Sequence, residues 1–315
     1  MRTAETAEDL RVCWLDLHQI TAGRVGLLLG LLRRFGSPLN VFRASREELT
    51  SCLGSSSPLV NLLAGGPDAR RVRGELAWLA RDKANLVTMD GPGYPALLRE
   101  IADPPPLLYV LGDPQALARP QIAIVGSRNP TAGGCRNARE FATALSRTGL
   151  IVTAGLSFGI DASAHRAALL AGGETIAVAG TGIDRVYPSQ HRELAHAIAH
   201  QGAVVSEFPL GCAPQRENFP TRNRIISGLS VGVLVVEAGI HSGSMITARL
   251  AAEQGREVFA IPGSIHSPLS RGCHALIRQG AKLVENTSDV LEEIGSCGQT
   301  AHGSAAPADA RPTTR

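Results

Sequence analysis

The segment Gln121-Ile122-Ala123-Ile124-Val125-Gly126-Ser127-Arg128 decides the fold of this 315-residue chain. Its apolar residues follow one another without alternation and end at a glycine. This pattern predicts a strand that is buried on both faces of a parallel sheet. Further apolar runs of the same kind follow downstream, at residues 150–153, 175–179, 203–206, 231–236 and 257–261.

Helical stretches alternate with these apolar runs. Strands that alternate with helices along the chain predict an α/β fold, a doubly wound and mostly parallel sheet covered by helices on both faces. The expected helices are Gly134–Arg147, Asp161–Leu170, Arg192–His200, Thr221–Ser227, Ser244–Gln254 and His274–Gln279.

The chain before this sheet has a different pattern. Residues 1–83 contain no strand-like run and are helical in pattern, so we expect a small all-α domain there. Ser45, followed by two glutamates, predicts the N-cap of a short helix that ends at Cys52. Another helix is expected at Asp68–Lys83.

Three further boundaries follow from the turn residues. Residues 84–118 are interrupted by proline and glycine clusters, and we expect a bridging segment with one short strand at Leu107–Leu111. The α/β domain then spans residues 119–295. Residues 296–315 are mostly Gly, Ala, Ser, Thr and Pro, and we expect them to form a disordered tail.

Composition excludes several classes of protein. With 44% hydrophobic and 19% charged residues, the chain is neither a disordered protein nor a coiled coil. It has no apolar run of membrane-spanning length and no secretory signal, so we expect a cytoplasmic protein that does not bind membranes. Its six cysteines contain no C-x-x-C pair, which disfavours a disulfide framework and a zinc site. The net charge is only +3, so an anionic ligand would need a local cluster of cations.

Three of the expected loops at the carboxyl ends of the strands could bind an anion. Gly126-Ser127-Arg128 lacks a G-x-G-x-x-G or G-K-[ST] pattern, and either grips a phosphate or is only a tight turn. Arg222 and Arg224 flank Asn223 near an expected helix start, where positive charge opposes the helix dipole and favours an anionic partner. Ser242-Gly243-Ser244 opens the next helix with free N–H groups, or is an ordinary cap.

Two further loops are ambiguous. Gly155-Leu156-Ser157-Phe158-Gly159 formally matches the nucleophile elbow of serine hydrolases, but two residues intervene before the expected helix. A hydrolase is therefore disfavoured. The segment from Gly180 to Arg185, followed by Tyr187-Pro188, either approaches a ligand or is a glycine-rich turn.

Taken together, these loops place four arginines on one edge of one sheet. Several phosphate-suited turns in a row favour a polymer as ligand. The sequence contains no paired catalytic carboxylates, no metal-spaced His/Cys set and no convincing nucleophile–base motif, so binding is favoured over catalysis. The arginines are Arg128, Arg185, Arg222 and Arg224.

An ordered set of motifs resembles the DNA-processing protein A (DprA/Smf) family of bacteria. The resemblance covers about residues 10–295, in the order and spacing of the family. The matching segments are IAIVGSR (Ile122–Arg128), GLSFGIDASAH (Gly155–His165), GTGIDRVYP (Gly180–Pro188), SEFP (Ser206–Pro209), FPTRNRIISGLS (Phe219–Ser230), VVEAGIHSGSMITARLAA (Val235–Ala252) and GCHALIRQGA (Gly272–Ala281).

The resemblance implies an extended Rossmann-like domain that binds single-stranded DNA without sequence preference, protects incoming DNA and loads RecA in natural transformation. It implies no enzymatic activity, no cofactor and no metal. It also implies a homodimer through the edge at about Gly272–Val284, with His274, Ile277 and Leu283 at the interface. The implied DNA-binding residues are Gly126, Ser127, Arg128, Ser157, Phe158, Gly159, Arg185, Phe219, Arg222, Asn223, Arg224, Ser242, Gly243 and Ser244.

The chain departs from the family pattern in its N-terminal and C-terminal parts. The helical region resembles the family's SAM-like or helix-hairpin-helix module, but its hairpin reads Thr21-Ala22-Gly23-Arg24 in place of a Gly-x-Gly turn. We therefore do not expect that hairpin to contact DNA. We also expect no winged-helix domain, because the chain stops in the tail at residues 296–315.

Two other functions remain as alternatives. A nucleotide-processing enzyme of the lysine-decarboxylase-like Rossmann group would use Glu237 as an acid, although that group's P-G-G-x-G-T signature is absent. A serine hydrolase would use Ser157 as its nucleophile. On the favoured interpretation, we expect Arg128→Ala and Arg224→Ala each to weaken strand binding without unfolding the protein.

Overall fold

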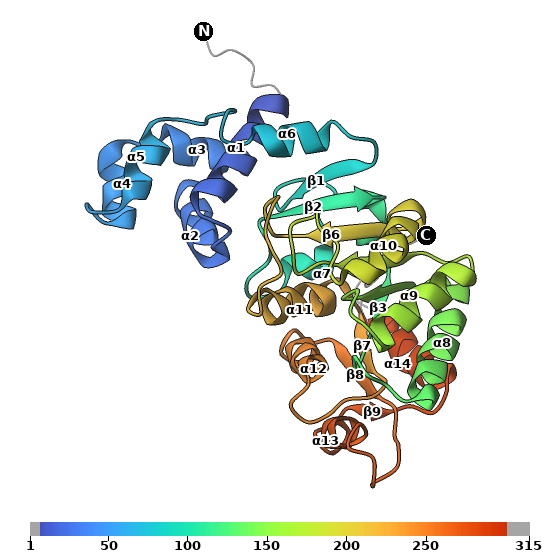
Figure 1. The fold of residues 1–315 in the computed structure, drawn as a ribbon. Coiled ribbons are helices and arrows are strands. Elements are labelled where there is room, and N and C mark those ends of the chain that lie inside the picture. The colour runs from blue at the N-terminus through green and yellow to red at the C-terminus, as the bar shows by residue number, and fades with distance from the viewer. Residues whose placement is uncertain (1–6, 301–315) are drawn as a thin grey trace, which may run out of the picture.

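The computed structural model describes residues 7–300 and contains a nine-stranded sheet at its centre (Figure 1). The strand order is β1-β2-β6-β5-β4-β3-β7-β8-β9. The six strands that the apolar runs predict are all present, and the α/β fold is confirmed. The strands are β1 (Ala84–Thr88), β2 (Leu107–Gly112), β3 (Gln121–Val125), β4 (Ile151–Ala154), β5 (Thr175–Val178), β6 (Ala203–Ser206), β7 (Gly232–Val235), β8 (Glu257–Ala260) and β9 (Lys282–Leu283).

The order of the strands reverses around β3. Strands β4, β5 and β6 follow β3 on one side, and β7, β8 and β9 lie on the other, all pairing in parallel. Ile122 of β3 is therefore in register with Val152 on one side and with Gly232 on the other. In doubly wound sheets the crevice at such a reversal, beyond the carboxyl ends of the strands, is where ligands bind.

Helices cover both faces of the sheet, which explains why its strands are apolar without alternation. One face packs against α8, α9 and α14 around Phe141 and Phe259. The opposite face packs against α7 and α11 to α13 around Ile225 and Val233. These helices are α7 (Ala96–Arg99), α8 (Ala132–Arg147), α9 (Ile160–Leu170), α10 (Arg192–Gln201), α11 (Asn218–Leu229), α12 (Gly243–Glu253), α13 (Arg271–Arg278) and α14 (Thr287–Thr300), with short 3-10 turns at Pro114–Ala118 and Ser189–His191.

The segment 84–118, expected to be a bridge with one short strand, contributes two strands to the sheet. β1 pairs antiparallel with β2, and β2 pairs antiparallel with β6, so that Tyr109 lies opposite both Leu86 and Ser206. The short strand expected at Leu107–Leu111 is present as β2. Sequence reasoning missed β1 because its five residues include Asn85 and because its partner strand follows only after a long irregular loop.

The N-terminal helices form a lobe beside β1 (Figure 1). The expected capping box at Ser45 is present, with the Ser45 N–H donating to the Glu48 carboxylate at 2.8 Å. The helix expected at Asp68–Lys83 is shorter and begins at Arg73, and Arg71 just before it binds the buried Asp16 carboxylate. The helices are α1 (Ala7–Ile20), α2 (Val25–Phe35), α3 (Pro38–Arg43), α4 (Arg46–Leu53), α5 (Pro58–Ala64) and α6 (Arg73–Leu79).

A cluster of three rings joins this lobe to the sheet. The Tyr109 ring on β2 meets the Trp78 ring edge-on at a centroid distance of 5.9 Å and the His18 ring at 6.1 Å. All three side chains are buried, and Trp78 and Tyr109 belong to one hydrophobic core that continues into β5, β6 and α10. The helical lobe therefore packs on the sheet and does not hang from it by a linker.

The first residues of the expected tail, 296–300, lie in a helix. Helix α14 continues to Thr300, since the glycine and serine residues near its end are tolerated within the helix. The rest of the expected tail, residues 301–315, lies outside the described residues. Among residues 7–300, every helix is too short or too polar to cross a membrane.

Acid should loosen the junction between the lobe and the sheet. Burial lowers the pKa of His18 to about 4, although a backbone contact with Glu207 offsets part of the effect. Between pH 6.5 and pH 4 the unfolded chain therefore binds a proton at His18 that the folded chain does not. Stability is lost as the pH falls, by about 2 kcal/mol from this residue between pH 7 and pH 5.

Urea denaturation at the two pH values tests this. His18→Gln should remove about 2 kcal/mol of the acid-induced loss of unfolding free energy. His200→Gln, at an exposed position at the end of α10, is the matched control and should retain the full loss. Equal pH dependence in the two variants would show that the folded protein binds a proton at His18 as readily as the unfolded chain does, which would contradict the lowered pKa.

Candidate nucleic-acid interface

A cleft of about 760 Å³ lies at the carboxyl ends of β3 and β7, where the strand order reverses. The loop after β3, the first two turns of α11 and the start of α12 form its walls. Its lining combines arginine, serine and asparagine side chains with two aromatic rings. The lining residues are Val125, Gly126, Ser127, Arg128, Asn129, Ser157, Asp161, Tyr187, Arg216, Phe219, Pro220, Arg222, Asn223, Ile226, Gly239, Ser242, Gly243, Ser244, Thr247 and Leu269.

The loop after β3 is held in place by backbone hydrogen bonds and presents Arg128 to solvent. The Ser127 N–H donates to the Glu237 carbonyl at 2.7 Å, and the Ser127 carbonyl accepts from the Ile160 N–H at 3.1 Å. The Ser127 amide is therefore not available to a phosphate. The exposed guanidinium of Arg128 lies 5.8 Å from the centroid of the Phe219 ring and pairs with no carboxylate of the described residues. It is positioned by a cation–π contact and free to bind an anion.

The loop after β4 is a rigid support for the first loop. Leu156 is buried with φ at +61°, and its carbonyl accepts from His191 Nδ1 at 2.9 Å. The Asp161 carboxylate accepts from the Ser157 N–H at 3.2 Å. Gly159 has φ at +78°, and a Cβ there would collide with the Ser127 carbonyl. Gly159 therefore packs against the first loop and does not line the cleft, and its expected contact with DNA stays a prediction.

Arg222 lies beneath the cleft. Helix α11 begins at Asn218, so Arg222 is in its second turn and only 4% exposed. Its Nη1 donates to the Gly155 carbonyl at 2.8 Å and also to the Val178 carbonyl. Glycine at position 155 leaves room for this contact, because a Cβ would lie 2.6 Å from the guanidinium. Burial lowers the pKa of Arg222 to about 10, so it keeps its positive charge at neutral pH.

Arg224 does not face the cleft, which corrects its expected role as a phosphate contact. Its guanidinium is 4% exposed and forms a bidentate pair with Glu207, at 2.9 Å and 2.6 Å. Its Nε donates to Asp103 at 3.0 Å. Because α11 starts earlier than the sequence predicts, Arg224 sits one turn deeper and binds carboxylates of the protein itself.

The start of α12 forms the opposite wall. Ser242 is its N-cap residue but makes no side-chain capping bond, and its Oγ lies 2.8 Å from Ser244 Oγ. Asn223 Nδ2 donates to the Gly243 carbonyl at 3.2 Å and thereby holds α12 against α11. The N–H groups at this helix start, together with the helix dipole, favour a bound anion.

Besides Gly159 and Arg224, two further expected contacts lie outside the cleft. Phe158 is 43% exposed and packs edge-on against His191, with 4.9 Å between ring centroids. Arg185 lines a neighbouring hollow and not the cleft. The structure adds Tyr187 and Arg216 to the lining, which sequence reasoning did not select. Tyr187 comes two residues after the glycine-rich segment Gly180–Arg185, and this position in the sequence is the signal that could have identified it.

The residues of the two alternative enzymes are engaged elsewhere. The Glu237 carboxylate accepts from the Thr131 N–H at 2.9 Å and from Thr131 Oγ1 at 2.6 Å at the start of α8. Ser157 Oγ donates to the Phe158 carbonyl, and His165 Nδ1 lies 2.6 Å from the Thr175 hydroxyl. Within the described part of the chain, no histidine is hydrogen-bonded to Ser157, and no three His, Cys, Asp or Glu side chains form a metal site.

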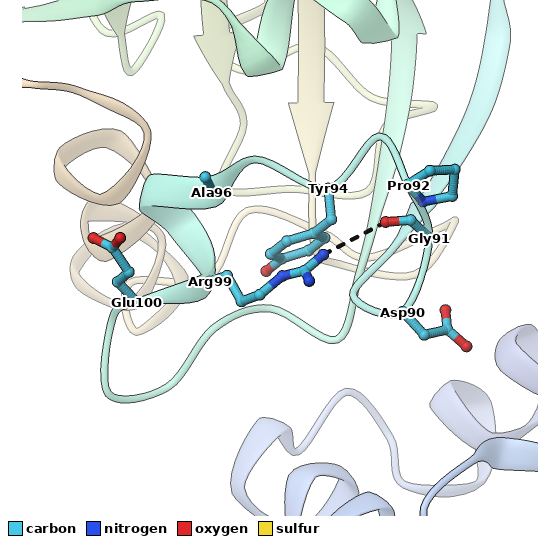
Figure 2. Close-up of a pocket in the computed structure, with 7 residues that line it drawn as sticks. All are labelled: Asp90, Gly91, Pro92, Tyr94, Ala96, Arg99 and Glu100. Carbon is cyan, nitrogen blue, oxygen red and sulfur yellow. Dashed lines mark hydrogen bonds between the residues drawn. The ribbon is translucent and has the colours of Figure 1, made fainter. Parts of the chain in front are cut away.

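Another hollow, of about 490 Å³, lies in the loop between β1 and α7 (Figure 2). Its one cation, Arg99, lies 5.5 Å from the centroid of the Tyr94 ring and donates to the Gly91 carbonyl. Figure 2 shows the carboxylates of Asp90 and Glu100 on opposite sides of that ring. With two carboxylates and one engaged cation among its lining residues, this hollow disfavours a phosphate.

The three residues expected at a dimer interface are distributed along one edge. Leu283 lies on the edge strand β9 and is 42% exposed. Ile277 is half-buried on α13. His274 Nε2 lies 3.0 Å from the Gly263 carbonyl of the same chain. The edge is thus apolar in part, and dimerisation through it stays a prediction.

Removing the Arg224 side chain should destabilise the fold. Arg224→Ala leaves the Glu207 carboxylate buried without its partner, and we expect a loss of about 3–5 kcal/mol in unfolding free energy. Arg128→Ala should leave stability within about 0.5 kcal/mol of the wild type, because Arg128 is exposed. Urea denaturation of both variants measures this. Equal stability would mean that the Arg224–Glu207 pair is not needed for folding.

Comparison with known proteins supports a common origin for these features. A model of the family described as DNA recombination-mediator protein A matches residues 85–295. Protein Smf of Escherichia coli is 48% identical over 226 residues, which cover 71% of this chain and 60% of that protein. Protein Smf of Synechocystis is 38% identical over 295 residues, covering 92% of this chain and 74% of that protein.

Solved structures show the same fold. DNA processing protein A from Streptococcus pneumoniae is 37% identical with a TM-score of 0.79, covering 89% of this chain and 97% of that one. DNA processing protein A from Helicobacter pylori, described for its single-stranded DNA binding mode, is 28% identical with a TM-score of 0.60, covering 69% and 97%. The matched range holds every segment that lines the cleft. The chain belongs to the DNA recombination-mediator protein A family, the family of the Smf and DprA proteins.

Proposed function

We propose that this protein binds single-stranded DNA in the cleft at the carboxyl ends of β3 and β7, without sequence preference. The observation that carries the proposal is the arrangement of positive charge in the cleft. Arg128 is exposed at one wall, the start of α12 forms the other wall, and Arg222 lies charged beneath both. Phosphate is the ligand that such a set of donors and dipoles recognises.

The size and lining of the cleft favour a single strand. A hollow of about 760 Å³ lies in the range that holds ligands of drug size, which suits a few nucleotides and not a duplex. Tyr187, which is 49% exposed, offers a ring face to a base of any identity beside the Phe219 ring that Arg128 covers. Backbone binding and stacking of this kind discriminate little between sequences.

The wider role follows from the family. We propose that the protein protects single-stranded DNA and loads a RecA recombinase onto it in the cytoplasm, in natural transformation and recombination. It would act as a homodimer through the edge that carries Ile277 and Leu283, and without catalysis or a cofactor. The binding of single-stranded DNA by the Helicobacter pylori relative supports the first step of this proposal.

Fluorescence anisotropy of a labelled oligothymidine, measured across a salt series with duplex DNA as competitor, tests the function. We expect binding that weakens steeply with salt and that duplex DNA competes poorly. Failure to bind at low salt would overturn the proposal. Release of ribose 5-phosphate from a nucleotide would instead favour the nucleotide-processing enzyme.

Arg128→Ala should weaken this binding roughly 10-fold, since one charge-assisted phosphate contact is lost. The slope of log affinity against log salt should fall by about 0.7, the value for one phosphate of a single strand. Arg139→Ala, at an exposed position on α8 that does not line the cleft, is the control and should behave as the wild type. If the two variants bind equally well, Arg128 does not contact the strand.

A further inference from the structure

A second basic hollow, which we call the side hollow, lies between the helical lobe and the sheet and has a volume of about 690 Å³. It is lined by segments from both parts of the chain, namely the end of α6, the loop that follows β5 and the start of α10. Its lining residues are Trp78, Arg81, Asp82, Leu111, Thr181, Ile183, Asp184, Arg185, Val186, Tyr187, Arg192, His196 and Pro214.

The charges of the side hollow favour an anion. Arg81 and Arg192 are exposed, and neither is paired with a carboxylate of the described residues. Arg185 lies 3.9 Å from Asp184, whose other oxygen accepts the Gly211 N–H at 2.9 Å. Three arginines therefore share the hollow with two carboxylates, and one of these carboxylates also binds the backbone.

Tyr187 connects the side hollow to the cleft, because it lines both. Its ring is 49% exposed and lies 5.5 Å from the Phe219 ring, centroid to centroid, at 43°. The Phe219 ring is in turn the one that Arg128 covers. A continuous row of Arg128, Phe219 and Tyr187 thus leads from the first loop of the cleft to the rim of the side hollow.

We propose that the side hollow is a second binding site for single-stranded DNA. It receives the strand as the strand leaves the cleft, with a base stacked on Tyr187 and phosphates beside Arg81 and Arg192. The proposal rests on the function proposed above and extends it to the helical lobe. The lobe then contributes through Arg81, directly after α6, and not through its hairpin at residues 21–24.

Strand length separates the two sites experimentally. Anisotropy is measured with oligothymidines of about 6 and about 16 nucleotides, which span the usual site sizes of single-strand binders. The double variant Arg81→Gln/Arg192→Gln should bind the short strand as the wild type does. It should bind the long strand roughly 10-fold more weakly, with a salt slope lower by about 1.4, the value for two phosphates.

The matched control is Arg139→Gln/Arg147→Gln, which removes two exposed arginines from α8 that line neither hollow. Urea denaturation establishes that both double variants are folded, as expected from the exposure of all four side chains. The control should bind both strands as the wild type does.

Three results would overturn the inference, and each is distinct. If both double variants bind the long strand equally well, the side hollow does not contact DNA although the cleft does. If Arg81→Gln/Arg192→Gln weakens both strand lengths equally, the hollow belongs to the primary site. If the wild-type protein binds neither strand, the proposed function fails together with the extension.

Discussion

The buried guanidinium of Arg222 is bonded to the carbonyls that end β4 and β5, and the cleft depends on this contact. Parallel strands leave carbonyl groups without partners at their carboxyl ends, and a buried carbonyl needs a donor. Arg222 supplies that donor from α11, and the glycine at position 155 leaves room for it. The same contact fixes α11 across the end of the sheet. It also places a positive charge beneath the crevice that the reversal of strand order creates.

Arg222 and Arg224 are two residues apart on one helix and differ in what they bind. Arg222 is surrounded by backbone carbonyls, so its charge is only partly compensated, by Asp161 nearby. Arg224 is neutralised by Glu207 and Asp103 and holds α11 to the loops that follow β6 and α7. A buried cation with carboxylate partners contributes little field to its surroundings, whereas one held by carbonyls does. In the proposed function, the anion is therefore bound by the field of Arg222 from below and by the exposed Arg128 from the side.

The sequence predicts the elements that contain a continuous apolar run of their own. It does not predict those whose structure depends on a residue far away along the chain. The six predicted strands are all present, because each is buried on both faces and carries the signal in its own residues. β1 carries no such signal, since it pairs only with β2 across a long loop. Helix α6 begins only after Arg71, whose partner Asp16 is 55 residues away in the sequence. Arg224 was misassigned for the same reason, because Glu207 and Asp103 are remote along the chain.

The sequence alone determined the parallel sheet, its alternation with helices, the family and the edge of the sheet at which the loops of the cleft lie. These depend on local apolar runs, on the order of the motifs and on the rule that parallel strands end together. Only the tertiary structure decided which arginines are available. A guanidinium is free or engaged according to the carboxylates and carbonyls that folding brings to it, as Arg128, Arg222 and Arg224 demonstrate. The tertiary structure also places Tyr187 between the cleft and the side hollow, and it brings Arg81 and Arg192 to the lining of one hollow. Residues this distant in the sequence share a surface only after the lobe packs on the sheet.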